Sequence, residues 1–303
     1  MAILAKILIR NNMWFLSLLS RLPFRILYPI ADTLYFLAYY LVKYRRKVVF
    51  SNLQKSFPDK NKQQIKSIAK QFYRNLAQVA VEVLKANSIP ANEFYKRVKP
   101  VNLEAVKKWQ DEGTTFIAMV PHLCNWEWIG LACSLYLEHE SDVIYQKLAH
   151  PAFDKFMYDL RSRFGAIPVE KKNVFRELLK RKNKVKAIGS VSDQTPTVGD
   201  HRYWTYFLNQ ETAFFHGTEK IAKKLNYAIC MIHMRRLKRG YYEMEFIPLD
   251  APPLNSDEHY YTARFASWLE KTIRDNPSDW LWTHKRWKLK KPKDIIIEPD
   301  QVS

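Results

Sequence analysis

Short apolar runs alternate with amphipathic helical segments along this chain, and this alternation constrains the fold more than any other feature. The runs predict strands at 114–120, 142–146, 185–191, 227–234 and 241–247, and those at 114–120 and 185–191 have the composition of buried strands. The segments with helical periodicity lie at 61–86, 102–110, 125–135, 152–163, 217–225 and 261–274. Strands that alternate with helices are typical of an α/β protein. We therefore predict an α/β fold with a mixed central sheet flanked by helices on both faces.

The N-terminal 42 residues are rich in large aliphatic and aromatic side chains. Two apolar runs, 14–22 and 26–42, are separated by Pro23 and Arg25, and the second is shorter than the roughly 20 residues of a spanning helix. It ends in the basic segment 43–47, as is typical of a cytoplasmic membrane face. The pattern favours a membrane anchor over residues 1–44, spanning or interfacial. The alternative is a pair of hydrophobic helices packed on the remainder of the protein. Residues 45–290 are predicted to form one domain, and residues 291–303 a C-terminal tail.

The net charge is +19 and the pI is about 9.7, so the surface is expected to attract anions. The anion classes are nucleic acid, anionic lipid, phosphorylated substrates and an acidic carrier protein. Nucleic acid is disfavoured because neither an RNP motif nor a helix-turn-helix pattern is present. The chain has only 7 glycines and no phosphate-binding glycine motif, and its 3 cysteines lack metal-ligand spacing. Neither a metal site nor another cofactor is predicted.

His122 and Glu127 are the candidate catalytic pair. His122 follows the strand predicted at 114–120, after Pro121, and Glu127 lies in the helix predicted from residue 125. An imidazole can take a proton from a hydroxyl, and a carboxylate on its other nitrogen fixes the tautomer. Alternatively, His122 is only a polar loop residue and Glu127 an acid that is favoured near a helix N-terminus. Cys124 is a weaker candidate nucleophile, because spacing alone does not activate a thiol.

Several segments resemble the late acyltransferases of lipid A biosynthesis, of the lauroyl and myristoyl type. This family belongs to the lysophospholipid-acyltransferase-like superfamily and carries a His-x4-Asp/Glu motif, which the segment 120–127 resembles. The other similar segments are 44–58, Arg161 to Gly165, Ser192 to Gln194 and 282–288. They occur in the family's order over most of the chain. Cys124 and Asn209 depart from the pattern because each stands where the family often has glycine, although asparagine tolerates left-handed backbone geometry better than most residues.

The resemblance implies a glycerolipid-acyltransferase-like fold and a fatty acyl transfer to a hydroxyl of a lipid A precursor at the cytoplasmic face of the inner membrane. The acyl thioester donor is expected to be acyl carrier protein. His122 is then the general base and Glu127 its orienter, without an acyl-enzyme. Substrate binding is predicted for the residues Arg161, Asn125, Asp193, Gln194 and Arg286. Arg161 is expected to bind the developing oxyanion or a phosphate of the acceptor. The same chemistry on another polar lipid, and a non-catalytic basic membrane or nucleic-acid-binding protein, remain alternatives.

Overall fold

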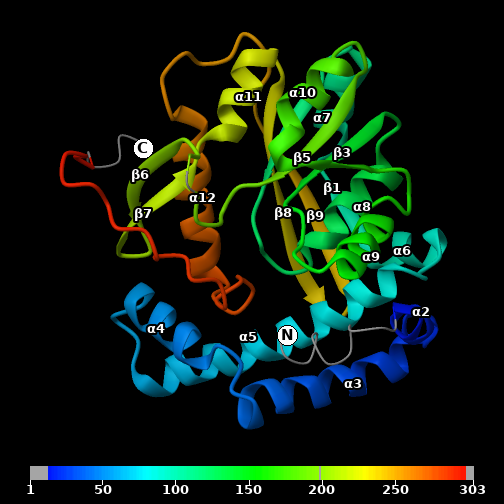
Figure 1. The fold of residues 1–303 in the computed structure, drawn as a ribbon, viewed down its shortest axis with the longest axis vertical. Coiled ribbons are helices and arrows are strands. Elements are labelled where there is room, and N and C mark those ends of the chain that lie inside the picture. Colours follow the sequence, from blue (N-terminus) through cyan, green and yellow to red (C-terminus); the bar gives the residue numbers. More distant parts are fainter. Residues whose placement is uncertain (1–12, 198, 298–303) are drawn as a thin grey trace.

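A seven-stranded central sheet forms the core of the computed structural model, which describes residues 13–197 and 199–297 (Figure 1). Its strand order is β1-β9-β8-β2-β5-β3-β4. The strands are β1 (Val98–Val101), β2 (Phe116–Val120), β3 (Glu140–Tyr145), β4 (Ile167–Glu170), β5 (Lys186–Val191), β8 (Ala228–Lys238) and β9 (Tyr241–Asp250). Strands β8 and β9 pair antiparallel, and all other neighbours pair parallel. The predicted mixed α/β sheet is confirmed.

Helices cover both faces of this sheet (Figure 1). They are α2 (Met13–Arg21), α3 (Phe24–Phe36), α4 (Arg46–Ser56), α5 (Lys62–Ala86), α6 (Ala91–Arg97), α7 (Leu103–Asp111), α8 (Trp126–Tyr136), α9 (Pro151–Arg161), α10 (Val174–Lys180), α11 (Gly217–Leu225) and α12 (Tyr260–Asp275). A π-helical turn, η1 (Leu37–Leu41), follows α3, and a 3-10 turn, η2 (Lys171–Asn173), precedes α10. Each strand and helix predicted from the hydrophobic pattern is present, with ends that differ by a few residues.

Strand β2 shows why the sheet needs helices on both sides. All of its residues are buried, and successive side chains point to opposite faces. Ile117 and Met119 pack in the cluster that includes residues of α5, α11 and α12, whereas Phe116 and Ala118 pack with residues of α8 and α9. A continuous apolar strand of this kind is typical of a parallel sheet with both faces covered.

The pattern did not predict β1, β4 or a separate hairpin of β6 (Arg202–Phe207) and β7 (Gln210–Phe215). β1 and β4 have only 4 residues each and both contain proline, which weakens the strand signal. The hairpin turns at Leu208 and Asn209, whose φ angles are 51° and 61°. Asn209 therefore adopts the left-handed geometry that was expected to be tolerated there.

The described N-terminal residues pack on the domain. Helix α3 lies along α5 and buries Leu27, Ala31 and Tyr35 against the core (Figure 1). Across residues 13–197 and 199–297, no helix combines the length and the apolar character that a membrane crossing requires. Part of the predicted anchor, residues 1–12, lies outside the described residues. This packing agrees with the alternative prediction, in which hydrophobic helices pack on the remainder of the protein.

Candidate active site

The candidate site is built at the carboxyl ends of two neighbouring parallel strands. Val120 at the end of β2 pairs with Val191 at the end of β5, and the Ser192 amide continues the pairing by donating to the Val120 carbonyl at 3.0 Å. His122 and Asp193 lie two residues beyond these paired ends. The loops that follow the strands therefore bring the two side chains together, at the edge where open α/β sheets bind ligands.

Asp193 holds His122 with both carboxylate oxygens. The Oδ1 atom lies 2.6 Å from His122 Nδ1, and Oδ2 accepts a hydrogen bond from the His122 backbone N–H at 3.0 Å. Trp280 fixes the carboxylate by donating its Nε1–H to Oδ2 at 2.7 Å. Gln194 Nε2 lies 3.0 Å from His122 Nε2. This pattern assigns the proton of a neutral imidazole to Nδ1 and leaves Nε2 as the acceptor, which is the form that a general base requires.

The carboxyl group of Asp193 is ionised although it is buried. Burial alone would raise its pKa, but the electrostatic interaction with His122 and the hydrogen bonds from His122 and Trp280 outweigh burial, so the pKa of Asp193 is lowered. An ionised carboxylate on Nδ1 stabilises the imidazolium that forms when Nε2 takes a proton.

Glu127 has a different partner from the one predicted. Its two oxygens accept hydrogen bonds from Arg161 Nη2 at 2.7 Å and Arg161 Nε at 2.9 Å. The carboxylate on His122 Nδ1 is that of Asp193, so Glu127 is not the group that orients the ring. Burial would raise the pKa of Glu127, yet the adjacent guanidinium outweighs burial and lowers it, with a further contribution from the charge of His122. Arg161 correspondingly presents its guanidinium fork to Glu127 in place of an oxyanion or a phosphate.

Breaking this pair is expected to destabilise the protein. Both side chains are about 15% exposed, so Arg161→Ala leaves a largely buried carboxylate without its counterion. We expect the free energy of unfolding to fall by about 3 kcal/mol, measured by denaturant unfolding of the detergent-solubilised protein. A double variant with leucine at both positions is expected to recover most of this loss. An equal loss in the single and double variants would contradict the assignment.

A cavity of about 360 Å³ opens beside His122. The polar and charged residues on its wall include His122, Glu127, Arg161, Lys171 and Gln194. Most of the remaining wall is apolar, and it includes residues of α8, β3, α10 and α11. A largely apolar cavity with a few convergent polar groups is the usual form of a small-molecule or lipid site.

Three predicted substrate-binding residues do not line this cavity. Asn125 is fully buried and donates from Nδ2 to Glu82 Oε2 at 3.0 Å, so its amide serves the core. Arg286 is 2% exposed, and its guanidinium lies 4.6 Å from the centre of the Phe214 ring. Burial lowers the pKa of Arg286 to about 10, against the opposing influence of Asp193. Asp193 contacts His122 and is not part of the cavity wall, so only Gln194 and Arg161 of the predicted set reach the cavity directly.

Cys124 has the geometry of a turn residue and not of a nucleophile. Its φ angle is 49°, in the left-handed region where glycine is favoured, and its backbone N–H donates to the Asp279 carbonyl at 3.0 Å. Burial, reinforced by the Asp279 charge, raises the pKa of the thiol well above its usual range. A protonated, buried thiol is a poor nucleophile.

Sequence comparison decides the family. Residues 4–289 match the family described as bacterial lipid A biosynthesis acyltransferase. The chain belongs to this acyltransferase family. It is 23% identical over 291 residues to the lipid A biosynthesis acyltransferase of Haemophilus influenzae (strain ATCC 51907 / DSM 11121 / KW20 / Rd), covering 95% of this chain and 89% of the relative. It is 20% identical over 276 residues to the lipid A biosynthesis lauroyltransferase of Escherichia coli (strain K12), covering 91% and 89% respectively.

The family assignment confirms the predicted resemblance and makes the protein an enzyme that transfers acyl groups. In this acyltransferase the segments singled out in the sequence meet in space. The 120–127 and 192–194 segments meet at His122, and the Arg161 segment reaches Glu127. Trp280 was missed as a site residue because nothing in its local sequence indicates that its indole faces Asp193.

Proposed function

We propose that this acyltransferase moves a fatty acyl chain from acyl carrier protein to a hydroxyl of a lipid A precursor, with His122 as the general base. The observation that carries the proposal is the pairing of His122 Nδ1 with Asp193 at 2.6 Å, on a ring that lines the cavity. The names of the two relatives, which concern lipid A biosynthesis, support the acceptor class.

The proposed reaction proceeds by direct attack. His122 Nε2 takes the proton of the acceptor hydroxyl, and the oxygen adds to the thioester carbonyl. When the tetrahedral intermediate collapses, the carbon–sulfur bond breaks and the leaving thiolate receives the proton from His122. The products are an ester and a free carrier thiol. Because Arg161 is engaged by Glu127, backbone N–H groups in the first turn of α8 are the proposed donors to the oxyanion.

Before the proton can move, Gln194 must leave His122 Nε2. The Gln194 amide occupies the nitrogen that receives the proton, at 3.0 Å. The acceptor hydroxyl would take this place and make the same hydrogen bond to Nε2. Glu127, held ionised by Arg161, then adds a second negative charge that favours the imidazolium.

The acyl chain is proposed to lie along the apolar wall of the cavity. A smaller apolar pocket of about 40 Å³ between α8 and the sheet shares the wall residues Trp126, Gly130, Val143 and Val191 with the main cavity. Apolar surface of this kind favours burial of methylene groups by roughly 0.8 kcal/mol each. The thioester carbonyl would then lie near His122, with the chain directed away from the polar groups.

The N-terminal helices are proposed to rest on the cytoplasmic face of the inner membrane. The outer face of α3 and η1 exposes Ile26, Phe36, Tyr40 and Leu41, opposite the buried face that contacts α5. An exposed basic segment with Lys43 and Lys47 follows directly. Apolar side chains bordered by basic ones are typical of an interfacial helix on anionic lipid. The net charge of +19 also suits an acidic carrier protein.

A comparison of lipid extracts tests the acceptor. We expect lipid A from cells that lack the gene to lose the mass of one secondary acyl chain, measured by mass spectrometry, and expression of the gene to restore it. A deletion of an unrelated gene in the same strain is the control. Unchanged lipid A together with the loss of an acyl chain from another polar lipid would reject lipid A as the acceptor while retaining the chemistry.

A further inference from the structure

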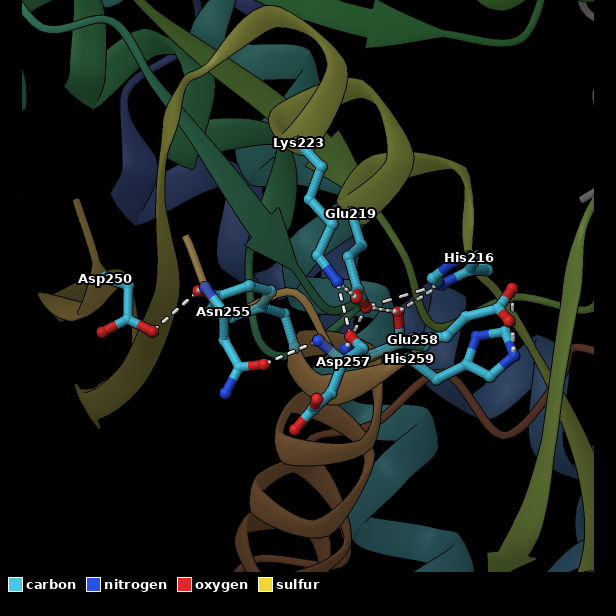
Figure 2. A network of polar contacts seen from close by, with 10 residues as sticks. His216, Glu219, Lys223, Asp250, Asn255, Asp257, Glu258 and His259 are labelled. Carbon is cyan, nitrogen blue, oxygen red and sulfur yellow. Dashed lines mark hydrogen bonds and ion pairs between the residues drawn. The ribbon is translucent and has the colours of Figure 1, made fainter. Parts of the chain in front are cut away.

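We propose that His216, Glu258 and His259 form a zinc-binding site, separate from the catalytic cavity. One ring nitrogen from each histidine and one oxygen of Glu258 lie within 4.8 Å of one another. His216 immediately precedes α11, and the other two residues immediately precede α12 (Figure 2). Two imidazoles and one carboxylate are a ligand set that Zn²⁺ uses, with water in the fourth position.

His216 is oriented as zinc-binding histidines usually are. It is 2% exposed, and its Nδ1 lies 3.1 Å from Thr262 Oγ1 and 3.4 Å from Glu219 Oε2. Glu219 Oε2 in turn accepts from Thr262 Oγ1 at 2.7 Å, which leaves the Thr262 oxygen free to accept the Nδ1 proton. Nε2 is then the unprotonated nitrogen. In most metal sites, a histidine that binds the metal through one ring nitrogen donates a hydrogen bond from its second ring nitrogen to a carboxylate, a carbonyl or another oxygen.

Glu219 is held as an anion by its surroundings. Lys223 Nζ lies 2.7 Å from Glu219 Oε1 (Figure 2). Glu219 Oε2 also accepts a hydrogen bond from the Thr262 backbone N–H at 2.9 Å. A carboxylate held in this way behind His216 raises the basicity of the ring that faces the other two ligands.

His259 supplies the second imidazole. Its Nδ1 is buried and has no hydrogen-bond partner among the described residues. The centres of the two histidine rings are 4.2 Å apart. An unpartnered buried ring nitrogen is unfavourable unless something binds it, and a cation would do so.

Glu258 is the ligand that can move. Its side chain is 72% exposed, and one carboxylate oxygen lies 3.7 Å from His259 Nε2, so the side chain must rotate to reach a metal bound at Nδ1. Zinc ligands lie about 2.0–2.2 Å from the metal, so closing the site requires the ligands to approach one another, and an exposed glutamate rotates readily. Lys220 is the cation that opposes metal binding, and it is engaged with His201 Nδ1 at 3.0 Å.

The site would join the start of α11 to the start of α12. On its other side, α11 and the strand before it contribute Ile221 and Phe215 to the catalytic cavity. Zinc would therefore stabilise this wall without touching the reacting groups. Cysteine spacing predicted no metal, and His216 lies more than 40 positions before Glu258 and His259, so the three residues meet only in the folded chain.

Equilibrium dialysis of the purified full chain against zinc chloride, followed by elemental analysis, tests the site. We expect one zinc per chain, and a rise in Tm of about 5 °C at a hundredfold excess of zinc over Kd. Glu258→Ala, at an exposed position, and His259→Gln are expected to lose both effects. The matched controls Asp257→Ala and His150→Ala, the latter at an exposed histidine before α9, are expected to keep them.

Two results would overturn the proposal. One is a wild-type chain that binds no stoichiometric zinc. The other is equal zinc binding and an equal Tm shift in Glu258→Ala, His259→Gln and the controls, which indicates adventitious binding elsewhere. Because Glu258 is exposed, the Tm of Glu258→Ala without zinc separates loss of the metal from loss of the fold.

Discussion

Replacing His122 with alanine is expected to lower kcat for acyl transfer by about 10³-fold, because the acceptor hydroxyl then has no base within reach. The imidazole is the group on the cavity wall whose Nδ1 is tied to a buried carboxylate. The rate is measured with purified enzyme, an acyl carrier protein donor and a lipid A precursor.

The fold and the membrane association of His122→Ala are expected to be unchanged, since the α3 face that we propose for lipid contact does not include this residue. His201→Ala, at an exposed histidine, is the matched control and is expected to retain activity. Activity of His122→Ala within a few-fold of wild type would remove His122 as the base.

Asp193→Asn is expected to lower kcat by about 10³- to 10⁴-fold with little change in the fold. An amide group facing Nδ1 no longer fixes the proton there, so the tautomer with a protonated Nε2 becomes favourable and the imidazolium loses its counterion. Asp159→Asn, at an exposed aspartate on α9, is the control. Wild-type kcat in Asp193→Asn would show that the 2.6 Å contact is not part of the mechanism.

Asp193 is also expected to make the stability of the wild-type protein depend on pH, and Asp193→Asn removes this contribution. The folded-state pKa of Asp193 is lowered below its usual value of about 4, so its ionised form stabilises the folded state above that pH, and this contribution is lost as the pH falls. Acid unfolding curves of wild type are therefore expected to fall more steeply below about pH 4 than those of Asp193→Asn. Parallel curves would contradict the assignment of an ionised Asp193.

The sequence predicted His122 correctly as a residue in the loop between a strand and a helix, but it predicted the wrong carboxylate as its partner. Glu127 was chosen because it lies five residues after His122, and a sequence shows directly only how far apart two residues are along the chain. Asp193 is adjacent only because β2 and β5 are neighbours in the sheet. Both residues were placed just beyond predicted strands, so the strand order was the single piece of information that was missing.

The partners of Arg286 and Arg161 were not predicted correctly, because the local sequence does not show what a guanidinium contacts in the fold. Arg286 lies in a segment of alternating lysines that is typical of a solvated surface, yet its side chain is buried beside Phe214. Arg161 was identified as a site residue, but a guanidinium binds a carboxylate and a phosphate with the same geometry. Only the folded chain shows that Glu127 is the anion it binds.

Strands and helices were predicted more reliably because their signal is periodic and local. The five predicted strands show either an apolar run, as at 114–120, or an alternation of apolar and polar residues, as at 241–247. Helix α5 has a capping box at Asn61 and Gln64 in addition to its apolar face. The short strands β1 and β4 carry no such signal.

In the proposed mechanism His122 activates the acceptor hydroxyl for direct attack on the thioester, which rapid-quench single-turnover transfer with a radiolabelled acyl carrier protein donor can test. We expect label to pass from the carrier to the lipid ester, with none on the denatured enzyme. His122→Ala is expected to form almost no labelled ester on the time scale of the wild-type turnover. Label that first accumulates on the enzyme and then chases into the lipid would contradict direct transfer.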